Sequence, residues 1–187
     1  MTEILKAGAL CPIRVTEDDI EVLLTRRTFW NYEKNRPFSL PGEWTFAGGL
    51  YDEEDDNLAE TAMREFREET NYDGQIRSIN FLRSGTQDAF WRTYLVEFYS
   101  ARINSDYQFT LMEKGEVIEI QWIRPADALS LIQSDEFTIE QSEEFRRRGL
   151  NDAKYGIHAV TERSLPVQNI LTLEHIQSIP ELIELYR

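Results

Sequence analysis

The length, composition and charge of the chain exclude several classes of protein. Its 187 residues include 41% hydrophobic residues and four Trp, which fits one folded domain rather than a disordered segment. The net charge of −14 would repel a nucleic-acid backbone, so we expect no binding to duplex nucleic acid. We also expect no signal peptide and no membrane span. The single Cys11 excludes an intrachain disulfide, which suits a reducing cytoplasm.

Hydrophobic patterns along the chain predict a mixed α/β protein. Strands are predicted at 6–15, 19–26, 75–83, 90–102 and 117–123, with a short aromatic strand at 44–46. A helix capped by Asn57 should bury Leu58, Ala62 and Phe66 at four-residue spacing. Further helices are predicted just after Pro125, at 138–148 and over 165–186 with a break at 180. We predict a single domain, with a core at about 5–130 and a helical C-terminal extension at about 136–187.

The most informative segment is an acidic helix preceded by two glycines. Glu65, Glu68 and Glu69 are three and four residues apart, so a helix would project them from one side. Three unpaired carboxylates so close would resist ionising together, and a hard divalent cation would relieve that repulsion. Gly48 and Gly49, interpreted as a turn, would let the backbone come close to a metal or a phosphate. The pattern predicts metal-assisted attack on a phosphate ester or anhydride, and the alternative is a solvated helix face with weak ion pairs.

This segment resembles the signature box of the Nudix hydrolases. The residues that match the box are Gly49, Arg64, Glu65, Phe66, Glu68 and Glu69. An early Glu of the family pattern is replaced by Asp55 or Asp56, and the spacing from Gly49 to Arg64 is one residue longer. The closing Gly is Asn71, a residue that also tolerates the left-handed conformation at a helix end. The likeness extends over roughly residues 5 to 130.

The resemblance implies a fold and a metal site. The fold would be an α/β/α sandwich with a mixed sheet. The carbonyl of Gly48 and the carboxylates of Glu65, Glu68 and Glu69 would bind Mg²⁺, with Mn²⁺ also possible. Arg64 would pair with acidic neighbours and orient the helix. The implied activity is hydrolysis of a nucleoside diphosphate linked to another moiety, and Glu65 would be a metal ligand or the base that orients the water.

A second glutamate from a later loop is also expected from the resemblance, as a metal ligand or general base. We choose Glu116 over Glu113 and Glu119, because it follows Gly115 where a loop meets a strand. An ordinary solvated loop carboxylate is the alternative.

Substrate contacts are predicted from basic and aromatic residues in an otherwise acidic chain. Trp30 could stack on a base, and Arg27, Arg36 and Arg92 could neutralise phosphate. The alternatives are a loop that packs by its own aromatics and arginines that serve solubility. The resemblance also implies a nucleotide-type small-molecule substrate and a possible homodimer, because the apolar C-terminal tail must pack on the domain or on a second subunit.

Two other functions remain open from the sequence. The segment Leu23-Leu24-Thr25-Arg26-Arg27-Thr28 is similar to a signature of the coenzyme A diphosphatase branch, and so is the spacing within the box. A coenzyme A diphosphatase is therefore one alternative. A non-catalytic metabolite-binding sensor is the other, although the loss of box glutamates that would favour it is not seen.

Overall fold

The computed structural model describes residues 4–16, 19–28, 30–31, 36–37, 42–89, 92–113, 115–132, 167–179 and 181–186. Its strands are β1 (Ile4–Val15), β2 (Ile20–Arg27), β3 (Trp30–Asn31), β4 (Arg36–Pro37), β5 (Trp44–Thr45), β6 (Ala47–Leu50), β7 (Arg77–Ala89), β8 (Arg92–Arg102) and β9 (Val117–Ile123). Its helices are α1 (Leu58–Thr70), α2 (Pro125–Ile132), α5 (Val167–Gln177) and α6 (Glu181–Tyr186). Both strands and helices are present, as the sequence predicts for the α/β class.

One mixed sheet of seven strands is built around β1. The main strand order is β5-β2-β1-β8-β7, with β6 paired to β1 and β9 paired to β2. Strand β1 runs parallel to β8 and antiparallel to β2 and β6. Its middle part pairs with β6 and its final part with β2, so two short antiparallel partners share one edge of β1. The strands β3 and β4 form a separate two-stranded hairpin.

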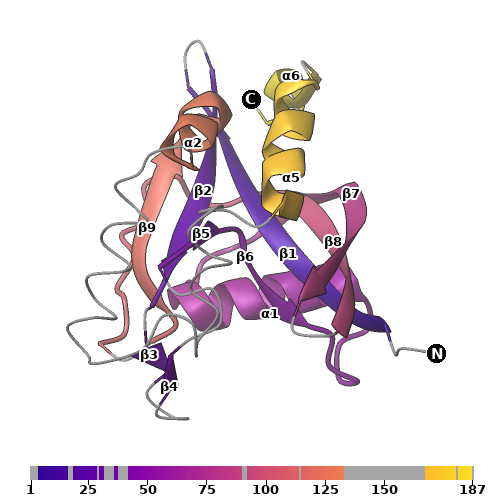
Figure 1. Ribbon diagram of the computed structural model, residues 1–187. Coiled ribbons are helices and arrows are strands. Elements are labelled where there is room, and N and C mark those ends of the chain that lie inside the picture. The colour runs from indigo at the N-terminus through magenta and orange to yellow at the C-terminus, as the bar shows by residue number, and fades with distance from the viewer. Residues whose placement is uncertain are drawn as a thin grey trace.

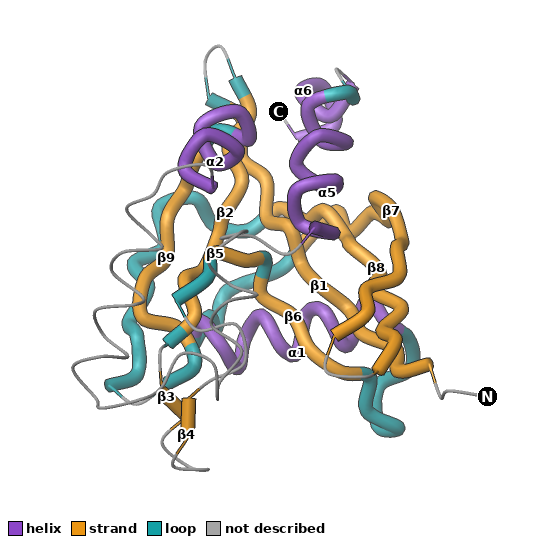
Figure 2. Tube along the Cα trace, in the orientation of Figure 1, coloured by secondary structure: helices purple, strands orange, loops and turns teal. Residues whose placement is uncertain are grey.

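The sheet carries a hydrophobic core on each face, because its strands bury side chains in alternation. On one face Leu10 and Leu23 pack in a core with Phe66 of α1. On the other face Cys11 and Val22 pack in a core that includes residues of α2, α5 and α6. Figure 1 shows α1 on one side of the sheet and α5 and α6 on the other, and Figure 2 shows the same two layers by element type. The fold is the predicted α/β/α sandwich.

Helix α1 has the two ends that the sequence predicts. The side chain of Asn57 accepts hydrogen bonds from the backbone amides of Ala59 at 2.9 Å and Glu60 at 3.1 Å, which caps the first turn. The helix ends at Asn71, whose φ of 55° and ψ of 34° lie in the left-handed region. Ala62 and Phe66 are buried as expected, whereas Leu58 is half-buried. The caps therefore determine where the acidic helix begins and ends.

The C-terminal helices are docked on the sheet. Leu173 and Ile176 of α5 and Leu182 and Tyr186 of α6 are buried in the core on that face. Polar contacts also anchor them, because Asn169 donates a hydrogen bond of 2.8 Å to Thr45 Oγ1. The tail is thus helical and packed on the sheet, as expected, with the break near 180. The helix predicted at 138–148 lies outside the described residues.

Within the described ranges, none of the helices has the length and apolar character needed to cross a membrane.

The docking of α5 is testable with a matched pair of leucines. Leu173 is fully buried and Leu171 is 39% exposed on the same helix. We expect Leu173→Ala to lower the free energy of unfolding by about 2–5 kcal/mol, because it leaves a cavity in the core. Leu171→Ala should change it by less than about 1 kcal/mol. Urea unfolding followed by circular dichroism measures both, and equal effects would show that α5 does not pack as described.

Candidate functional site

The glycine pair lies in a strand, which corrects the expected turn. Gly48 and Gly49 belong to β6 and pair with Ala9 and Gly8 of β1. A Cβ atom at Gly48 would lie 2.4 Å from the carbonyl oxygen of Gly8, and one at Gly49 would lie 2.4 Å from Cδ of Glu65. The glycines are therefore needed for close approach rather than for a reversal of the chain. They allow β6 to pair closely with β1, and the absence of a side chain at Gly49 leaves room for the Glu65 carboxyl.

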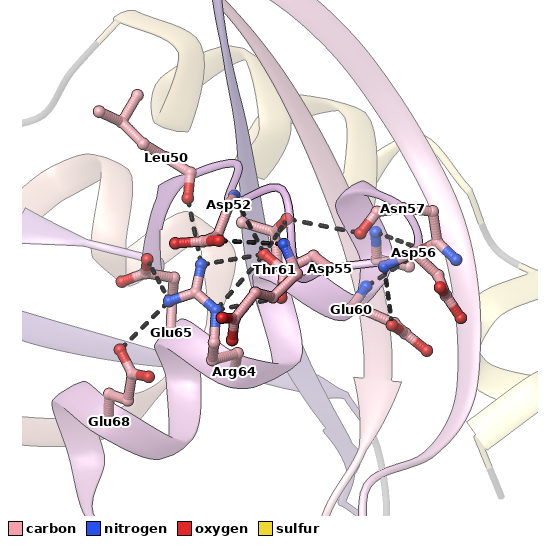
Figure 3. A network of polar contacts seen from close by, with 12 residues as sticks. Leu50, Asp52, Asp55, Asp56, Asn57, Glu60, Thr61, Arg64, Glu65 and Glu68 are labelled. Atoms are coloured by element: carbon pink, nitrogen blue, oxygen red, sulfur yellow. Dashed lines mark hydrogen bonds and ion pairs between the residues drawn. The ribbon is translucent and has the colours of Figure 1, made fainter.

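Arg64 joins the loop after β6 to the first carboxylates of α1. Its guanidinium donates to Asp55 at 3.0 Å, to Glu65 at 2.8 Å and to Glu68 at 3.2 Å. It also donates to the carbonyl oxygen of Leu50 at 3.1 Å. Figure 3 shows the guanidinium between these four groups. These contacts confirm that Arg64 pairs with acidic neighbours, and they raise the pKa of its guanidinium, chiefly through Asp55.

Asp55 is one of the two residues that the sequence offers for the early glutamate of the box, and it is the one that contacts Arg64. Its side chain is buried, and it accepts hydrogen bonds from Arg64 and from Thr61 Oγ1 at 2.8 Å. The amide of Asp52 is a further donor at 3.3 Å. The Arg64 hydrogen bonds are the main reason that the pKa of Asp55 falls to about 2. Asp55 is therefore ionised at neutral pH, and its carboxylate links the loop to α1.

The carboxyl of Glu69 lies deeper than those of Glu65 and Glu68. Burial raises its pKa to about 8, and the charges of Glu116 and Glu65 add to the rise. The charge of Arg27 and a hydrogen bond from the Gly48 amide act in the opposite direction. Burial also raises the pKa of Glu65, and Glu68 and Glu116 contribute to that rise. The structure therefore brings Glu65, Glu69 and Glu116 within electrostatic range of one another, beside β6.

These carboxyl groups are oxygen donors of the type that Mg²⁺ and Mn²⁺ prefer. In the described part of the chain, however, no three His, Cys, Asp or Glu side chains gather closely enough to form a complete ligand set. Arg64 occupies the carboxylates of Glu65 and Glu68, and the Glu68 side chain is 59% exposed. The residues fit a divalent cation by charge and chemistry, and Glu68 would have to leave Arg64 to join the others.

Arg27 and Glu116 reach the site from the end of β2 and the start of β9. The pairing of these strands shifts between Arg26 and Arg27, an irregularity that redirects side chains at a strand end. Just beyond, the Thr28 amide donates 2.7 Å to the carbonyl oxygen of Glu116. Arg27 is half-buried and its charge acts on Glu69, whereas Glu116 is exposed. The structure thus brings two separately predicted residues to the carboxylates of α1.

The other predicted substrate contacts are Trp30, Arg36 and Arg92, and of these the structure describes only the Arg92 side chain. Trp30 and Arg36 belong to the β3–β4 hairpin, in which Trp30 pairs with Pro37 and Asn31 with Arg36, and their side chains are outside what the structure describes. Arg92 is exposed at the start of β8, where the next residue pairs with Ile4 at the start of β1. No contact among the described residues joins Arg92 to the box, and these three roles stay predictions.

Glu43 is a buried acidic residue near Arg27 that the sequence does not single out. It is 3% exposed and lies directly before β5. Burial raises its pKa to about 8, and the charge of Arg27 opposes the rise. An acidic residue before a Trp in a short aromatic strand is an ordinary pattern, and only the pairing of β2 with β5 brings it beside Arg27.

The ionised contacts of Asp55 predict that wild type and Asp55→Asn differ in how their stability depends on pH. Because the folded pKa of Asp55 lies below its unfolded value, its ionised contacts stabilise the protein above about pH 4. That contribution disappears as the pH falls toward 2. Asp55→Asn should therefore lower the Tm at pH 7 and approach the wild-type Tm near the acid limit. Thermal unfolding across this pH range measures the difference, with exposed Glu53→Gln in the same loop as control. A gap in Tm that stays constant with pH would contradict the ionised state of Asp55.

Comparisons with known proteins agree with this geometry. No curated protein matches the sequence. The structure of a NUDIX hydrolase from Alicyclobacillus acidocaldarius is 19% identical with a TM-score of 0.66, and the alignment covers 100% of this chain and 97% of that one. A C. elegans Ap4A hydrolase in a binary complex is 16% identical with a TM-score of 0.58, and the alignment covers 93% of this chain and 96% of that one. The NUDIX domain of Shewanella oneidensis NrtR, complexed with ADP ribose, is 23% identical with a TM-score of 0.52. That alignment covers 77% of this chain and 89% of the NrtR domain.

At these identities the solved structures show a common fold. A family model described as the NUDIX domain matches residues 5–145, which is well over half of the chain. The matched range contains the box glycines, the whole of α1 and Glu116. The chain therefore belongs to the NUDIX domain family, and it is a hydrolase that acts on phosphoanhydride bonds.

Proposed function

We propose that the protein is a divalent-metal-dependent pyrophosphohydrolase that cleaves a nucleoside diphosphate linked to another moiety. The observation that carries this proposal is the group of carboxyls of Glu65, Glu69 and Glu116, which act on one another electrostatically beside the glycines of β6. Mutual repulsion between neighbouring carboxylates is relieved by a cation, and a cation at this place would in turn attract a phosphate chain.

Nudix hydrolases generally use divalent metal ions. In this chain Glu65, Glu68, Glu69 and the carbonyl of Gly48 would hold Mg²⁺, or Mn²⁺ in its place. When bound, the ion would neutralise phosphate charge and lower the pKa of a water molecule.

The side chains around the ion site divide the remaining tasks. Arg27, whose charge acts on Glu69, would bind a phosphate oxygen of the substrate through its guanidinium. Glu116 is exposed and close to the box carboxylates, so its carboxylate can accept a proton from water while staying open to solvent. Arg64 acts as a positioning residue, because it ties the loop through Asp55 to the helix that bears the carboxylates.

The structural neighbours guide the choice of substrates. One is an Ap4A hydrolase and another is a domain complexed with ADP ribose, so dinucleoside polyphosphates and ADP-ribose are the first compounds to test. Coenzyme A stays an alternative from the resemblance of residues 23–28. A non-catalytic sensor stays the other alternative, and the presence of Glu65, Glu68 and Glu69 favours hydrolysis over it. The homodimer and the cytoplasmic location stay predictions.

A substrate panel tests the function directly. We expect hydrolysis of at least one of ADP-ribose, Ap4A, NADH, nucleotide sugars, coenzyme A and nucleoside triphosphates, with Mg²⁺ or Mn²⁺ and not with EDTA. Separation of the products by anion-exchange chromatography identifies the bond that is cut. Binding of one of these compounds without any turnover would support the sensor instead.

Removal of a box carboxylate tests the metal site. We expect Glu69→Gln and Glu68→Gln to lower kcat by roughly a hundredfold or more, because each removes a ligand of the ion. Mn²⁺ binding followed by electron paramagnetic resonance should weaken in parallel. Glu174→Gln, which changes an exposed carboxylate on α5, is the matched control and should match wild type in both measurements. Full activity and unchanged Mn²⁺ binding in both box variants would exclude these residues as ligands.

A further inference from the structure

The parallel pairing of β1 with β8 stops before the end of β1. The last paired residues are Pro12 and Ala101, although β1 runs on to Val15. A cavity of about 460 Å³ opens beyond this pair, and it is lined by residues 13–16, Arg102, Ile103, Ser105 and Tyr186. We call it the β1–β8 cavity, and its volume is within the range of small-molecule sites.

The β1–β8 cavity lies far from the carboxyls of the candidate site. The Glu65 carboxyl lies against Gly49, which pairs with Gly8 of β1. Val15, at the cavity, lies roughly 20 Å further along this extended strand. Figure 1 shows the same separation, with the end of β1 at the top of the view and α1 at the bottom. A ligand in the cavity would therefore not touch the residues proposed to bind the cation.

Positive charge gathers at this cavity, in a chain with 34 acidic and 20 basic residues. Arg14 and Arg102 both line it. Arg77 is the direct cross-strand partner of Arg102, and like charges opposite each other destabilise a sheet. The Arg77 guanidinium bonds to the neutral side chain of Gln75, and no hydrogen bond or ion pair joins Arg102 to any residue that the structure describes. This pair of arginines is therefore suited to binding negative charge.

The guanidinium of Arg14 is held in position, with part of it unused. Its Nε donates 2.6 Å to a carboxylate oxygen of Glu21, and its Cζ lies 4.6 Å from the centre of the Trp122 ring. Its two terminal nitrogens have no hydrogen-bond acceptor in the described part of the chain. A guanidinium presents its donors in a rigid fork that matches phosphate and carboxylate oxygens. The Glu21 and Trp122 contacts reduce the freedom that Arg14 would lose on binding an anion.

We propose that the β1–β8 cavity binds a small organic anion, with Arg14 and Arg102 contacting its phosphate or carboxylate group. Ser105 is exposed on the wall and supplies a hydroxyl donor. Val15 and Ile103 supply apolar surface for the body of the ligand. Glu21 offsets the charge of Arg14 alone, so the cavity keeps a net positive charge for the anion. The site shares no residue with the carboxyl group of α1, and it does not depend on the proposed hydrolysis.

A titration of ¹⁵N-labelled protein with phenyl phosphate tests the site, because this probe carries a phosphate on a small apolar ring. We expect the backbone amide signals of Val15, Thr16, Ile103 and Ser105 to shift together and to saturate, with a Kd of about 1 mM or lower. Benzoate in place of phenyl phosphate shows which anionic group is accepted, and binding of either supports the proposal. No saturating shift at these amides with either anion, shifts confined to Gly48, or an equal response to neutral benzyl alcohol overturns it.

Two arginine variants and a matched control show whether the guanidinium groups bind the probe. Arg102→Gln and Arg14→Gln should each raise Kd at least about fivefold, because each removes a charge-assisted contact. Lys6→Gln removes the same charge from an exposed residue near the start of β1 and should change Kd by less than about twofold. A wild-type Kd in Arg102→Gln, or an equal loss in Lys6→Gln, overturns the proposal. If Arg14→Gln does not fold without its Glu21 contact, the exposed Arg102 still decides by the same criterion.

Discussion

The close approach of three backbone segments is the constraint on which the site depends. A Cβ atom at Gly8 would lie 2.2 Å from the carbonyl oxygen of Leu58, and one at Gly48 would lie 2.4 Å from the carbonyl oxygen of Gly8. These distances leave no room for a side chain between β1, β6 and the first turn of α1. The acidic helix is thereby pressed against the strand pair. Its glutamates reach the glycine strand because nothing bulkier separates them.

An excess of negative charge follows from this packing. Helix α1 brings the carboxyls of Glu65 and Glu69 to the glycine strand, while Arg64 is shared between the loop and two glutamates of the helix. The charge of Arg27 and a hydrogen bond from Gly48 both favour the ionised form of Glu69. A protein of net charge −14 has few cations to add, so an external cation is the natural complement.

The local features of the fold could be predicted from the sequence, and the features that depend on distant pairing could not. Asn57 and Asn71 mark the ends of α1 through their own side chain and backbone, so each can be recognised in isolation. Strands β1, β2, β8 and β9 have strong apolar patterns and were located within a few residues. The Gly48-Gly49 strand was mistaken for a turn, because two glycines carry no strand pattern and their role is set by Gly8 and Glu65.

The residues of the candidate site also fall into those that local sequence predicts and those that only the pairing of distant strands brings together. The spacing of Glu65, Glu68 and Glu69 is a property of one helix, and the sequence alone reveals it. Glu116 is predicted from its place where a loop meets a strand and Arg27 from its charge in an acidic chain, and the pairing of β2 with β9 brings them together. Glu43 carries no local signal, because its burial and its proximity to Arg27 follow from the β2–β5 pairing. Asp55 and Asp56 are neighbours in sequence, and only the hydrogen bonds from Arg64 and Thr61 distinguish them.

A crystal structure of the protein grown with Mn²⁺ would test the central claim most directly, through the anomalous scattering of the ion. The account predicts a peak coordinated by Glu69, by at least one of Glu65 and Glu68, and by the carbonyl of Gly48, with Glu68 released from Arg64. Manganese found only at other carboxylates, with Arg64 still holding both Glu65 and Glu68, would contradict it.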